Sequence, residues 1–307
     1  MDKGKWKRLT SRTEFSVLCA LVVLIVIMSV ASPYFLKTAN IFNVLSQISR
    51  YGIISVGMAL VMITGGISVG YVVGLSATMG AFMITNLGIP WPLVFILVIL
   101  MGALIGAVNG FFITVVNLPA FIVTLAMSKI LSGCILLLTK GMPISFDTPL
   151  AYLGSGYIGV VPVCIIVGTI FAERTQTGRN IYAAGNNERA ASLSGIKIRK
   201  TKTLVYIICS VLCSFCGIIV AGNLYSADAT LGVGYDIDTI AAVVIGGVSM
   251  TGGEGSIWGA LIGASIMGVL KNGFVLLSIS SYWQSIVIGL VILAAVTIDR
   301  IRANKKI

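Results

Sequence analysis

Histidine is absent from this sequence, and charged residues are scarce. The absence of histidine excludes imidazole metal ligands, histidine general bases and histidine proton relays. Charged residues make up only 10% of the 307 positions, whereas a soluble domain carries roughly 25%. Proline occurs only 7 times, which argues against a disordered or collagen-like chain despite the 35 glycines. A soluble globular domain is excluded as well.

Hydrophobic residues are what the sequence has in abundance. They fill 57% of it, and the mean hydropathy is +1.04, which is more apolar surface than one soluble core could bury. The apolar runs are continuous, whereas the strands of a membrane barrel alternate over about ten residues. We therefore expect an all-α integral membrane protein, with residues 1–307 forming one transmembrane domain in a lipid bilayer.

The apolar stretches predict about ten transmembrane helices. Between Tyr51 and Ser128, 78 consecutive residues carry no charge. At roughly 20 residues per crossing this run holds three spans and the start of a fourth. It is divided by polar breaks at 64–66, 86–92 and 117–119, and its last span continues to about 138. The remaining spans are expected at 15–32, 148–171, 203–227, 239–253, 255–270 and 272–298, the last of these including the loop before it.

Basic residues bracket the apolar runs and give the orientation. There are 21 Lys and Arg against 10 Asp and Glu. Most of the basic residues fall in three groups: Lys3, Lys5, Lys7, Arg8 and Arg12; Arg174, Arg179, Arg189, Lys197, Arg199, Lys200 and Lys202; and Arg300, Arg302, Lys305 and Lys306. By the positive-inside rule these groups mark cytoplasmic regions. Both termini and the segment 173–202 are therefore expected in the cytoplasm, and we expect no nucleic-acid partner.

A short sequence recurs between the two halves of the chain. Residues 102–107 reappear at 259–264, and Asn109-Gly110-Phe111 reappears at 272–274. The copies belong to the fourth and ninth spans, which cross in opposite directions. This predicts an inverted repeat that relates spans 2–5 to spans 7–10. The alternative is coincidence, because glycine and alanine are favoured wherever membrane helices pack closely.

The only long hydrophilic stretch between spans is 173–202, and it predicts a short helix over 185–195. Asn187 can cap the start of this helix, and Glu188 favours the positive end of its dipole. Gly195 can end it in a left-handed conformation. Such a helix, with a pair of alanines on one face, suits docking into a groove on a partner. The alternative is a solvated loop.

Four stretches resemble the membrane permease of bacterial ribose-type sugar importers of the ATP-binding-cassette class. In chain order they are Thr64–Gly70 (TGGISVG), Asn109-Gly110 with Leu118–Leu125 (LPAFIVTL), Gly178–Ile196 (beginning GRNIYAAGNN) and Gly234–Gly253 (beginning GYDIDTIAAVVIGG), followed by Gly255, Asn272-Gly273 and Ser281-Tyr282. Each stretch is weakly specific alone. Together, in this order and on this topology, they cover nearly the whole chain and identify it as similar to that family.

The resemblance implies a permease subunit in the bacterial cytoplasmic (inner) membrane that moves a ribose-like pentose or a hexose by alternating access. It implies three partners: a second permease subunit, identical or paralogous, a separate cytoplasmic ATPase, and an extracytoplasmic solute-binding protein. ATP and Mg would sit on the ATPase, so this chain would bind no cofactor and would not be an enzyme. The coupling helix that docks on the ATPase would comprise Gly185, Asn186, Asn187, Glu188, Arg189, Ala190, Ala191, Ser194 and Gly195.

Two features of the sequence bear on that resemblance. The chain contains no Gly-x-x-x-x-Gly-Lys-Ser/Thr loop for the phosphates of ATP, which agrees with a separate ATPase. The family's first motif usually runs Gly-Gly-Ile-Asp-Leu-Ser-Val-Gly, but here Ser68 follows Ile67 directly. The missing pair removes a carboxylate near the inner end of span two and shifts the register of span three by about 200°. We carry no family role over to this turn.

A sugar path needs groups that bond hydroxyls with little net charge. The candidates are Thr64, Ser68, Asn109, Thr124, Asn272, Tyr282 and Gln284, with Phe121 and Trp283 to close the path or stack on a sugar. The alternative for each is ordinary helix packing.

Lys129 lies about ten residues into span five, roughly 15 Å deep, where a charge usually faces the bundle interior or a water-filled path. We expect a pathway or intersubunit role for it, and snorkelling for Arg50 and Lys271.

Acidic residues and cysteines give two further candidate sites. Asp228, Asp236 and Asp238 follow span seven on the outer side without basic neighbours, so they are candidates for docking the binding protein. The alternative is the usual depletion of basic residues on the outer side of the membrane.

Three cysteines, Cys209, Cys213 and Cys216, share one helix face. We interpret them as small packing side chains rather than a metal or redox site, because no histidine or carboxylate lies nearby, and we expect no metal.

Three other functions compete with sugar import. A permease of the same superfamily could carry a nucleoside, a polyol or a furanose-type signalling molecule, and the sequence does not separate these. An ion-coupled secondary transporter would need carboxylates inside the membrane, and none of the 10 acids is expected in the middle of a span. A membrane enzyme would need a nucleophile with a base or a metal cluster, and no such set is present in the sequence.

Overall fold

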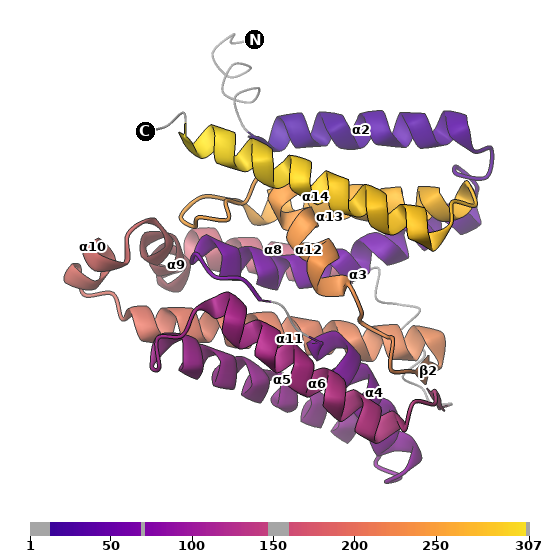
Figure 1. Ribbon diagram of the computed structural model, residues 1–307, viewed down its shortest axis with the longest axis horizontal. Coiled ribbons are helices and arrows are strands. Elements are labelled where there is room, and N and C mark those ends of the chain that lie inside the picture. The colour runs from indigo at the N-terminus through magenta and orange to yellow at the C-terminus, as the bar shows by residue number, and fades with distance from the viewer. Residues whose placement is uncertain (1–12, 69–70, 147–159, 305–307) are drawn as a thin grey trace.

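Long helices form nearly the whole structure (Figure 1). The computed structural model describes residues 13–68, 71–146 and 160–304. The terminal basic residues before 13 and after 304, and the first part of the span predicted at 148–171, lie outside these ranges. The elements are α2 (Thr13–Ala31), α3 (Thr38–Ile63), α4 (Val72–Thr85), α5 (Trp91–Thr114), α6 (Ala120–Thr139), β1 (Ile144–Ser145), α8 (Val160–Arg174), α9 (Gln176–Asn186), α10 (Glu188–Leu193), α11 (Ile198–Leu224), β2 (Ser226–Ala227), α12 (Tyr235–Ile245), α13 (Ile257–Leu276) and α14 (Ser281–Asn304).

The helical class predicted from the sequence is confirmed, and each predicted span contains a helix. Within the described residues, six helices are long and apolar enough to cross a membrane: α2, α3, α5, α6, α11 and α13. Helices α4 and α12 are shorter, with 14 and 11 residues. The count of ten crossings therefore stays a prediction. The two strands form one short antiparallel pair that joins the α6–α8 and α11–α12 connections.

Two predicted boundaries were wrong, and both for the same reason. Helix α3 begins at Thr38, so Arg50 lies near its middle rather than at a span end. Helix α13 continues to Leu276, so Asn272 lies within a helix rather than in a loop. A charge ended each predicted span, Arg50 in one case and Lys271 in the other. Both side chains have interaction partners inside the bundle, so the helices continue through them.

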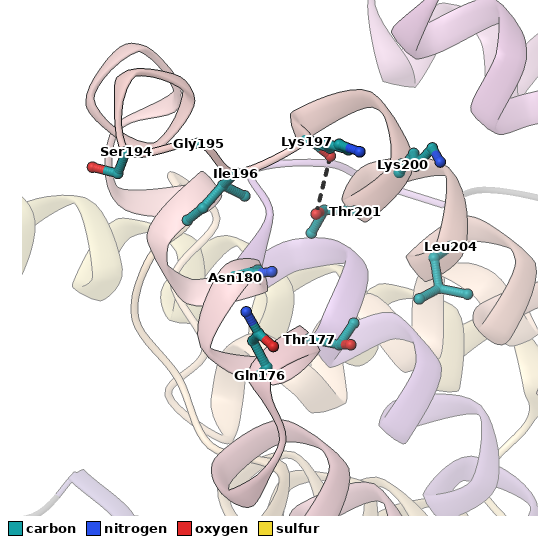
Figure 2. Close-up of a pocket in the computed structure, with 10 residues that line it drawn as sticks. All are labelled: Gln176, Thr177, Asn180, Ser194, Gly195, Ile196, Lys197, Lys200, Thr201 and Leu204. Atoms are coloured by element: carbon teal, nitrogen blue, oxygen red, sulfur yellow. Dashed lines mark hydrogen bonds between the residues drawn. The ribbon is translucent and has the colours of Figure 1, made fainter.

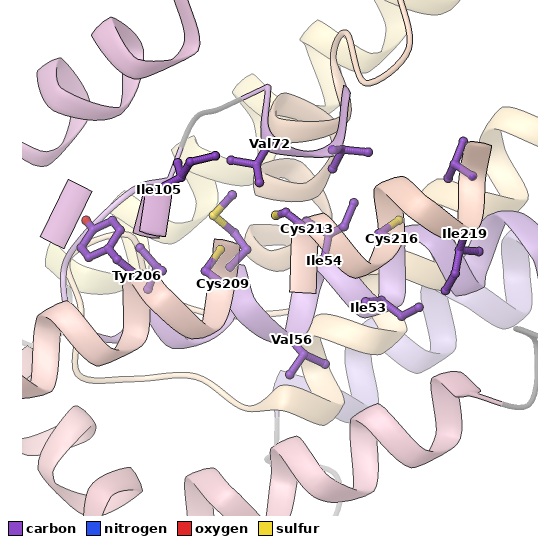
Figure 3. Packing of buried hydrophobic residues seen from close by; sticks show 14 of the residues in the cluster. Ile53, Ile54, Val56, Val72, Ile105, Tyr206, Cys209, Cys213, Cys216 and Ile219 are labelled. Atoms are coloured by element: carbon purple, nitrogen blue, oxygen red, sulfur yellow. The ribbon is translucent and has the colours of Figure 1, made fainter. Parts of the chain in front are cut away.

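Helices α3 and α11 lie side by side in the centre of the core (Figure 3). Every residue of α3 from Tyr51 to Ile63 is buried. The cysteines of α11 point into this apolar packing, with Cys209 and Cys216 no more than 1% exposed. This placement supports their interpretation as packing side chains. Among the described residues, no group of three His, Cys, Asp or Glu could hold a metal ion.

The repeated small residues bring helices into close contact in both halves. A Cβ on Gly106 of α5 would lie 2.6 Å from the Cα of Ile207 in α11. A Cβ on Gly263 of α13 would lie 1.8 Å from the carbonyl oxygen of Ala242 in α12. Contacts this short exclude any side chain larger than hydrogen at either glycine. The recurring glycines therefore have a packing role in each copy.

The two ends of the connection between α3 and α4 lie beside different turns of α11. Gly66 at its start lies beside the Tyr206 hydroxyl of α11, and the carbonyl of Val73 just after its end lies beside Gly217. These two positions on α11 are separated by 11 residues, or roughly 16 Å along a helix. Gly66 and Val73 thus follow α11 in the direction opposite to α3, in which Gly57 lies beside Cys209 and the Arg50 carbonyl lies beside Cys216. Helix α4 therefore starts at membrane depth, as do the discontinuous helices that line solute sites in transporters.

Candidate coupling and translocation sites

The predicted short helix of the hydrophilic segment is present as α10. The Asn187 side chain caps it by accepting a hydrogen bond from the Ala190 amide, with N and Oδ1 3.0 Å apart. Glu188 lies in its first turn, where it also pairs with Lys202. Gly195 ends the segment at a φ of 85°, the left-handed conformation that glycine adopts without strain. Ala191 is buried, whereas Leu193 is 91% exposed.

The first residues assigned to the coupling helix belong to a different element. Gly185 and Asn186 form the last turn of α9, which meets α10 at Asn187. The Tyr182 hydroxyl of α9 donates a hydrogen bond to the carbonyl oxygen of Gly255, at 2.9 Å. Burial, followed by the charge of Glu173, raises the pKa of Tyr182, so this hydroxyl stays protonated and remains a donor. Helix α9 is thereby fixed to the α12–α13 connection.

Three glycine-containing segments contact one another at the end of α9. We call this contact the glycine junction, and it comprises residues 63–66, 185–186 and 251–253. The Gly253 amide donates to the Ile63 carbonyl at 2.8 Å. A Cβ on Gly185 would lie 1.8 Å from that same carbonyl oxygen, and a Cβ on Gly252 would lie 2.9 Å from the Gly65 amide nitrogen. A displacement of α9 and α10 would therefore change the contacts at the end of α3, where the connection to α4 begins.

Three predicted path residues lie in or beside the connection that follows α3. Thr64 is 2% exposed, and its hydroxyl donates to the Val61 carbonyl. Thr124 of α6 is fully buried and lies with its hydroxyl 3.5 Å from the Ile67 carbonyl. Ser68 follows directly and is half-buried. The Thr64 and Thr124 hydroxyls already donate to backbone carbonyls, so a path role for these residues stays a prediction.

The two asparagines of the sequence repeat have different surroundings. Asn272 in α13 exchanges two hydrogen bonds with Asn40 in α3, at 2.9 and 3.0 Å. Asn109 in α5 is 3% exposed, and its Oδ1 has no hydrogen-bond partner among the described residues. The pairing of Asn272 favours the packing alternative for that residue. The unmatched oxygen keeps Asn109 as a path candidate.

The other predicted path residues lie elsewhere on the surface of the single chain. Lys129 and Phe121 are exposed on α6, so Lys129 does not face the interior of this bundle. An intersubunit or pathway position outside the bundle fits it better. Tyr282 and Trp283 are exposed at the start of α14, 82% and 62% respectively. Gln284 donates to the Ile279 carbonyl at 2.9 Å. A path role for these five residues stays a prediction.

The three aspartates predicted as one docking surface differ in exposure. Asp238 is 5% exposed and forms an ion pair with Lys271 of α13. The Tyr51 hydroxyl of α3 also donates to Asp238 Oδ2, at 3.3 Å. Asp238 therefore does not belong to an exposed surface, and Lys271 pairs rather than snorkels. Asp238 lies in the first turn of α12 rather than in a connection, so the expectation that no acid lies in the middle of a span stays a prediction.

The other two aspartates differ from Asp238 and from each other. Asp236 is half-buried, and one of its oxygens accepts from the Ile237 amide at 2.9 Å. Asp228 lies in the connection after α11 and accepts from the hydroxyl and the amide of Thr230. These bonds hold the pKa of Asp228 below its usual range, with the Thr230 hydroxyl contributing most. Asp228 therefore stays ionised, and it remains a docking candidate.

Comparisons with known proteins identify the family. Residues 40–296 match the family described as the branched-chain amino acid transport system permease component. The chain belongs to this family of permeases. Similar relatives include the ribose import permease proteins of Haemophilus influenzae, 41% identical over 94% of this chain and 93% of the relative, and of Escherichia coli strain K12, 42% identical over 95% and 94%. No solved structure matches the chain.

A third relative, the ribose import permease protein of Bacillus subtilis, is 40% identical over 91% of this chain and 90% of its own length. The resemblance found in the sequence motifs is thus confirmed. Together with the six apolar helices, the family membership makes this permease a multi-pass protein of the inner membrane.

The sequence motifs missed several residues of the permease that the structure places at these sites. Asn40, Tyr51 and Tyr206 pair with or lie beside residues more than 130 positions away in the sequence. No local spacing marks such pairs. The recurrence of Asn-Gly-Phe did mark Asn272, but not its partner on α3.

Replacing Asn272 distinguishes its packing role from a path role. We expect Asn272→Ala to lower the free energy of unfolding by about 1–3 kcal/mol, because the buried Asn40 amide loses both of its bonds to this partner. The KM for the transported solute should stay unchanged. Denaturant unfolding of the purified permease and an uptake titration measure the two quantities. A raised KM with unchanged stability would instead place Asn272 in the path.

Proposed function

We propose that this permease is the membrane-spanning subunit of an ATP-binding-cassette importer that carries ribose or a closely related monosaccharide into the cell. The observation that carries the proposal is the identity of 40–42% to ribose import permeases over at least 90% of this chain. The chain itself hydrolyses nothing in this proposal. A separate cytoplasmic ATPase binds ATP and Mg, a second permease subunit completes the pathway, and an extracytoplasmic protein delivers the sugar.

The glycine junction supports transport by alternating access. Closure of the ATPases would displace α10, and α9 moves with it because the two helices share Asn187. The junction then passes the displacement to Ile63 and to the α12–α13 connection. The chain after Ile63 leads to α4, and the α12–α13 connection follows α12. The motion would therefore reach both short helices.

The helix contacts support the inverted repeat. Helix α11 packs on α4, α5 and α3, and helix α3 packs on α12, α13 and α11. In the same way, α4 contacts α5 and α6, and α12 contacts α13 and α14. This is the pattern that a pseudo-two-fold axis relating α3–α6 to α11–α14 would produce. The two short helices occupy corresponding positions in the halves, as in transporters whose solute site lies near the bilayer midplane.

The ends of the outer helices support a cytoplasmic location for both termini. Figure 1 shows that α2 begins and α14 ends at the same end of the bundle as α9 and α10. The side chain of Glu14 at the start of α2 lies near Gly259, close to the glycine junction. If α10 faces a cytoplasmic ATPase, α2 begins on that side and α14 ends on it.

Uptake in a defined strain tests the proposal. A bacterium that lacks its own ribose permease but keeps the ATPase and binding protein should regain uptake of labelled ribose when this chain is expressed. Unlabelled solutes then rank the specificity. Galactose is an informative competitor, because the galactose/methyl galactoside import permease protein of Haemophilus influenzae is 33% identical to this chain.

Two outcomes would contradict the proposal. Competition by a nucleoside or polyol and not by ribose would assign another solute to the same class of permease. Uptake that persists without ATP and collapses with a protonophore would indicate an ion-coupled transporter. The buried Asp238 alone does not favour the second outcome, because Lys271 already neutralises its charge.

The exposed tip of α10 gives a test of ATPase docking. Leu193 is a large apolar side chain, 91% exposed, and such a side chain is expected to fill a pocket on a partner. We expect Leu193→Asp to weaken binding of the ATPase by about tenfold or more, with unchanged thermal unfolding of the permease. Leu87→Asp is the matched control, because Leu87 is 58% exposed in the α4–α5 connection. Equal binding by both variants would contradict docking through α10.

A further inference from the structure

A pocket of about 560 Å³ lies between α9 and the first turns of α11. Figure 2 shows Gln176 and Asn180 of α9 on one side and Lys197, Lys200 and Leu204 on the other. No acidic residue lines the pocket. Ser194 and Gly195 of the predicted coupling segment also line it, whereas Leu193, the side chain that we assign to the ATPase, does not.

The pocket carries two positive charges without counterions in the part of the chain that the structure describes. Lys197 and Lys200 are exposed, and neither belongs to the ion pairs formed among those residues. By contrast, Lys202 on the same stretch is paired with Glu188. The charge on the two lysines is therefore available to an anionic ligand.

The remaining lining residues supply donors and one apolar edge. The amides of Gln176 and Asn180 are donors of the kind that phosphate oxygens accept. The Thr201 hydroxyl is already used, because it donates to the Lys197 carbonyl at 3.2 Å. Leu204 is 38% exposed. The pocket thus combines positive charge, amide donors and an apolar side chain.

The position of the pocket along α11 matches the surface of a membrane. From Thr203 to Leu224 this helix carries no charge, whereas the residues from Lys197 to Lys202 are strongly basic. Leu204 therefore lies at the start of the apolar part, with the two lysines one to two turns farther out. A phospholipid has the same order, with acyl chains below an anionic head group. Basic pockets on the cytoplasmic side of transmembrane helices bind such head groups.

We propose that this pocket binds the phosphate head group of an anionic phospholipid. The phosphate lies between the lysines, its oxygens accept from the α9 amides, and an acyl chain passes Leu204. The bound lipid would join α9, which forms part of the glycine junction, to α11. The proposal does not depend on which solute the permease carries, so its failure and that of the proposed function are independent.

Binding of defined lipids to the purified full-length permease tests this assignment. Phosphatidylglycerol and zwitterionic phosphatidylcholine are titrated in mild detergent and followed by native mass spectrometry. The test variant is Lys197→Gln/Lys200→Gln. The matched control is Arg179→Gln/Arg199→Gln, which removes two exposed charges from the same segment without touching the pocket lining. Thermal unfolding of both variants checks that each is folded.

We expect the lysine variant to bind phosphatidylglycerol about thirtyfold more weakly, because each lysine beside an anionic lipid contributes roughly a factor of five. The arginine control should lose much less, and phosphatidylcholine should bind all three proteins alike. An equal loss in both variants would overturn the proposal. Displacement of the lipid by millimolar inorganic phosphate would assign the pocket to free phosphate and overturn the lipid assignment. Weaker ATPase binding with unchanged lipid binding would assign it to the protein partner instead.

Discussion

A single methyl group at Gly185 should uncouple this permease. The Cβ of Gly185→Ala would lie 1.8 Å from the Ile63 carbonyl oxygen and 2.6 Å from the Gly253 amide nitrogen. Both are backbone atoms, and they already bond to each other at 2.8 Å, so no side-chain rotation relieves the clash. Helix α9 must move away from α3, and overpacking of this kind costs about 1–3 kcal/mol. We expect ribose uptake to fall by about tenfold or more.

The matched control for Gly185 is Gly133→Ala. Gly133 is also helical, but no atom lies within 4 Å of a Cβ built on it, so uptake should stay normal. Initial uptake rates, divided by the amount of folded permease in the membrane, give the comparison. ATPase binding should be retained in the Gly185 variant, because α10 itself is unchanged. Normal uptake by Gly185→Ala would show that the junction does not carry the coupling motion.

Replacing either residue of the buried Asp238–Lys271 ion pair should destabilise the permease, but by different amounts. The side chain of Asp238 is 8% exposed, whereas that of Lys271 is 26% exposed. Lys271→Met therefore leaves a buried carboxylate whose one remaining side-chain partner among the described residues is the Tyr51 hydroxyl. Loss of one partner of a buried pair costs about 3–5 kcal/mol. Asp238→Asn leaves an ammonium that can reach water along its long stem, so we expect a smaller loss.

The double variant distinguishes the energy of the ion pair from the energies of the two single substitutions. Asp238→Asn with Lys271→Met removes both charges, and we expect most of the lost stability to return, because no uncompensated charge remains. Denaturant unfolding of the four proteins in the same detergent gives the coupling energy. The Lys202–Glu188 pair is the control, because Lys202→Met leaves behind a carboxylate that is 55% exposed and should cost less than about 1 kcal/mol. Additive losses in the double variant would show that the two residues act independently.

The contact between α12 and α13 through this pair also bears on transport. Helix α12 is only 11 residues long, so its position depends on its neighbours more than on membrane spanning. Asp238 ties its first turn to α13 and, through Tyr51, to the middle of α3. In the proposed mechanism, the ion pair therefore fixes one of the two short helices to α3, on which a displacement of α10 would act.

The amino-acid sequence by itself determined the class of this protein, its helices and the capped helix of its hydrophilic segment. These depend on local properties. Apolar runs read by hydropathy predicted where helices lie, and Asn187, Glu188 and Gly195 marked the start and end of α10 because caps act within a few residues. The ordered motifs were enough to place the chain in its family, which the match over residues 40–296 confirms.

Only the tertiary structure decided which distant residues meet. The pairing of Asp238 with Lys271, the Asn40–Asn272 bonds and the glycine junction all join segments separated by at least 33 positions. Whether a charged residue is buried and paired depends on the residues that surround it in the folded protein. Asp238, which the sequence predicted as an exposed charge, is therefore a neutralised residue inside the bundle. The same reason moved Arg50 and Lys271 from span ends into helices, because partners across the bundle let a charge remain where hydropathy alone would end the span.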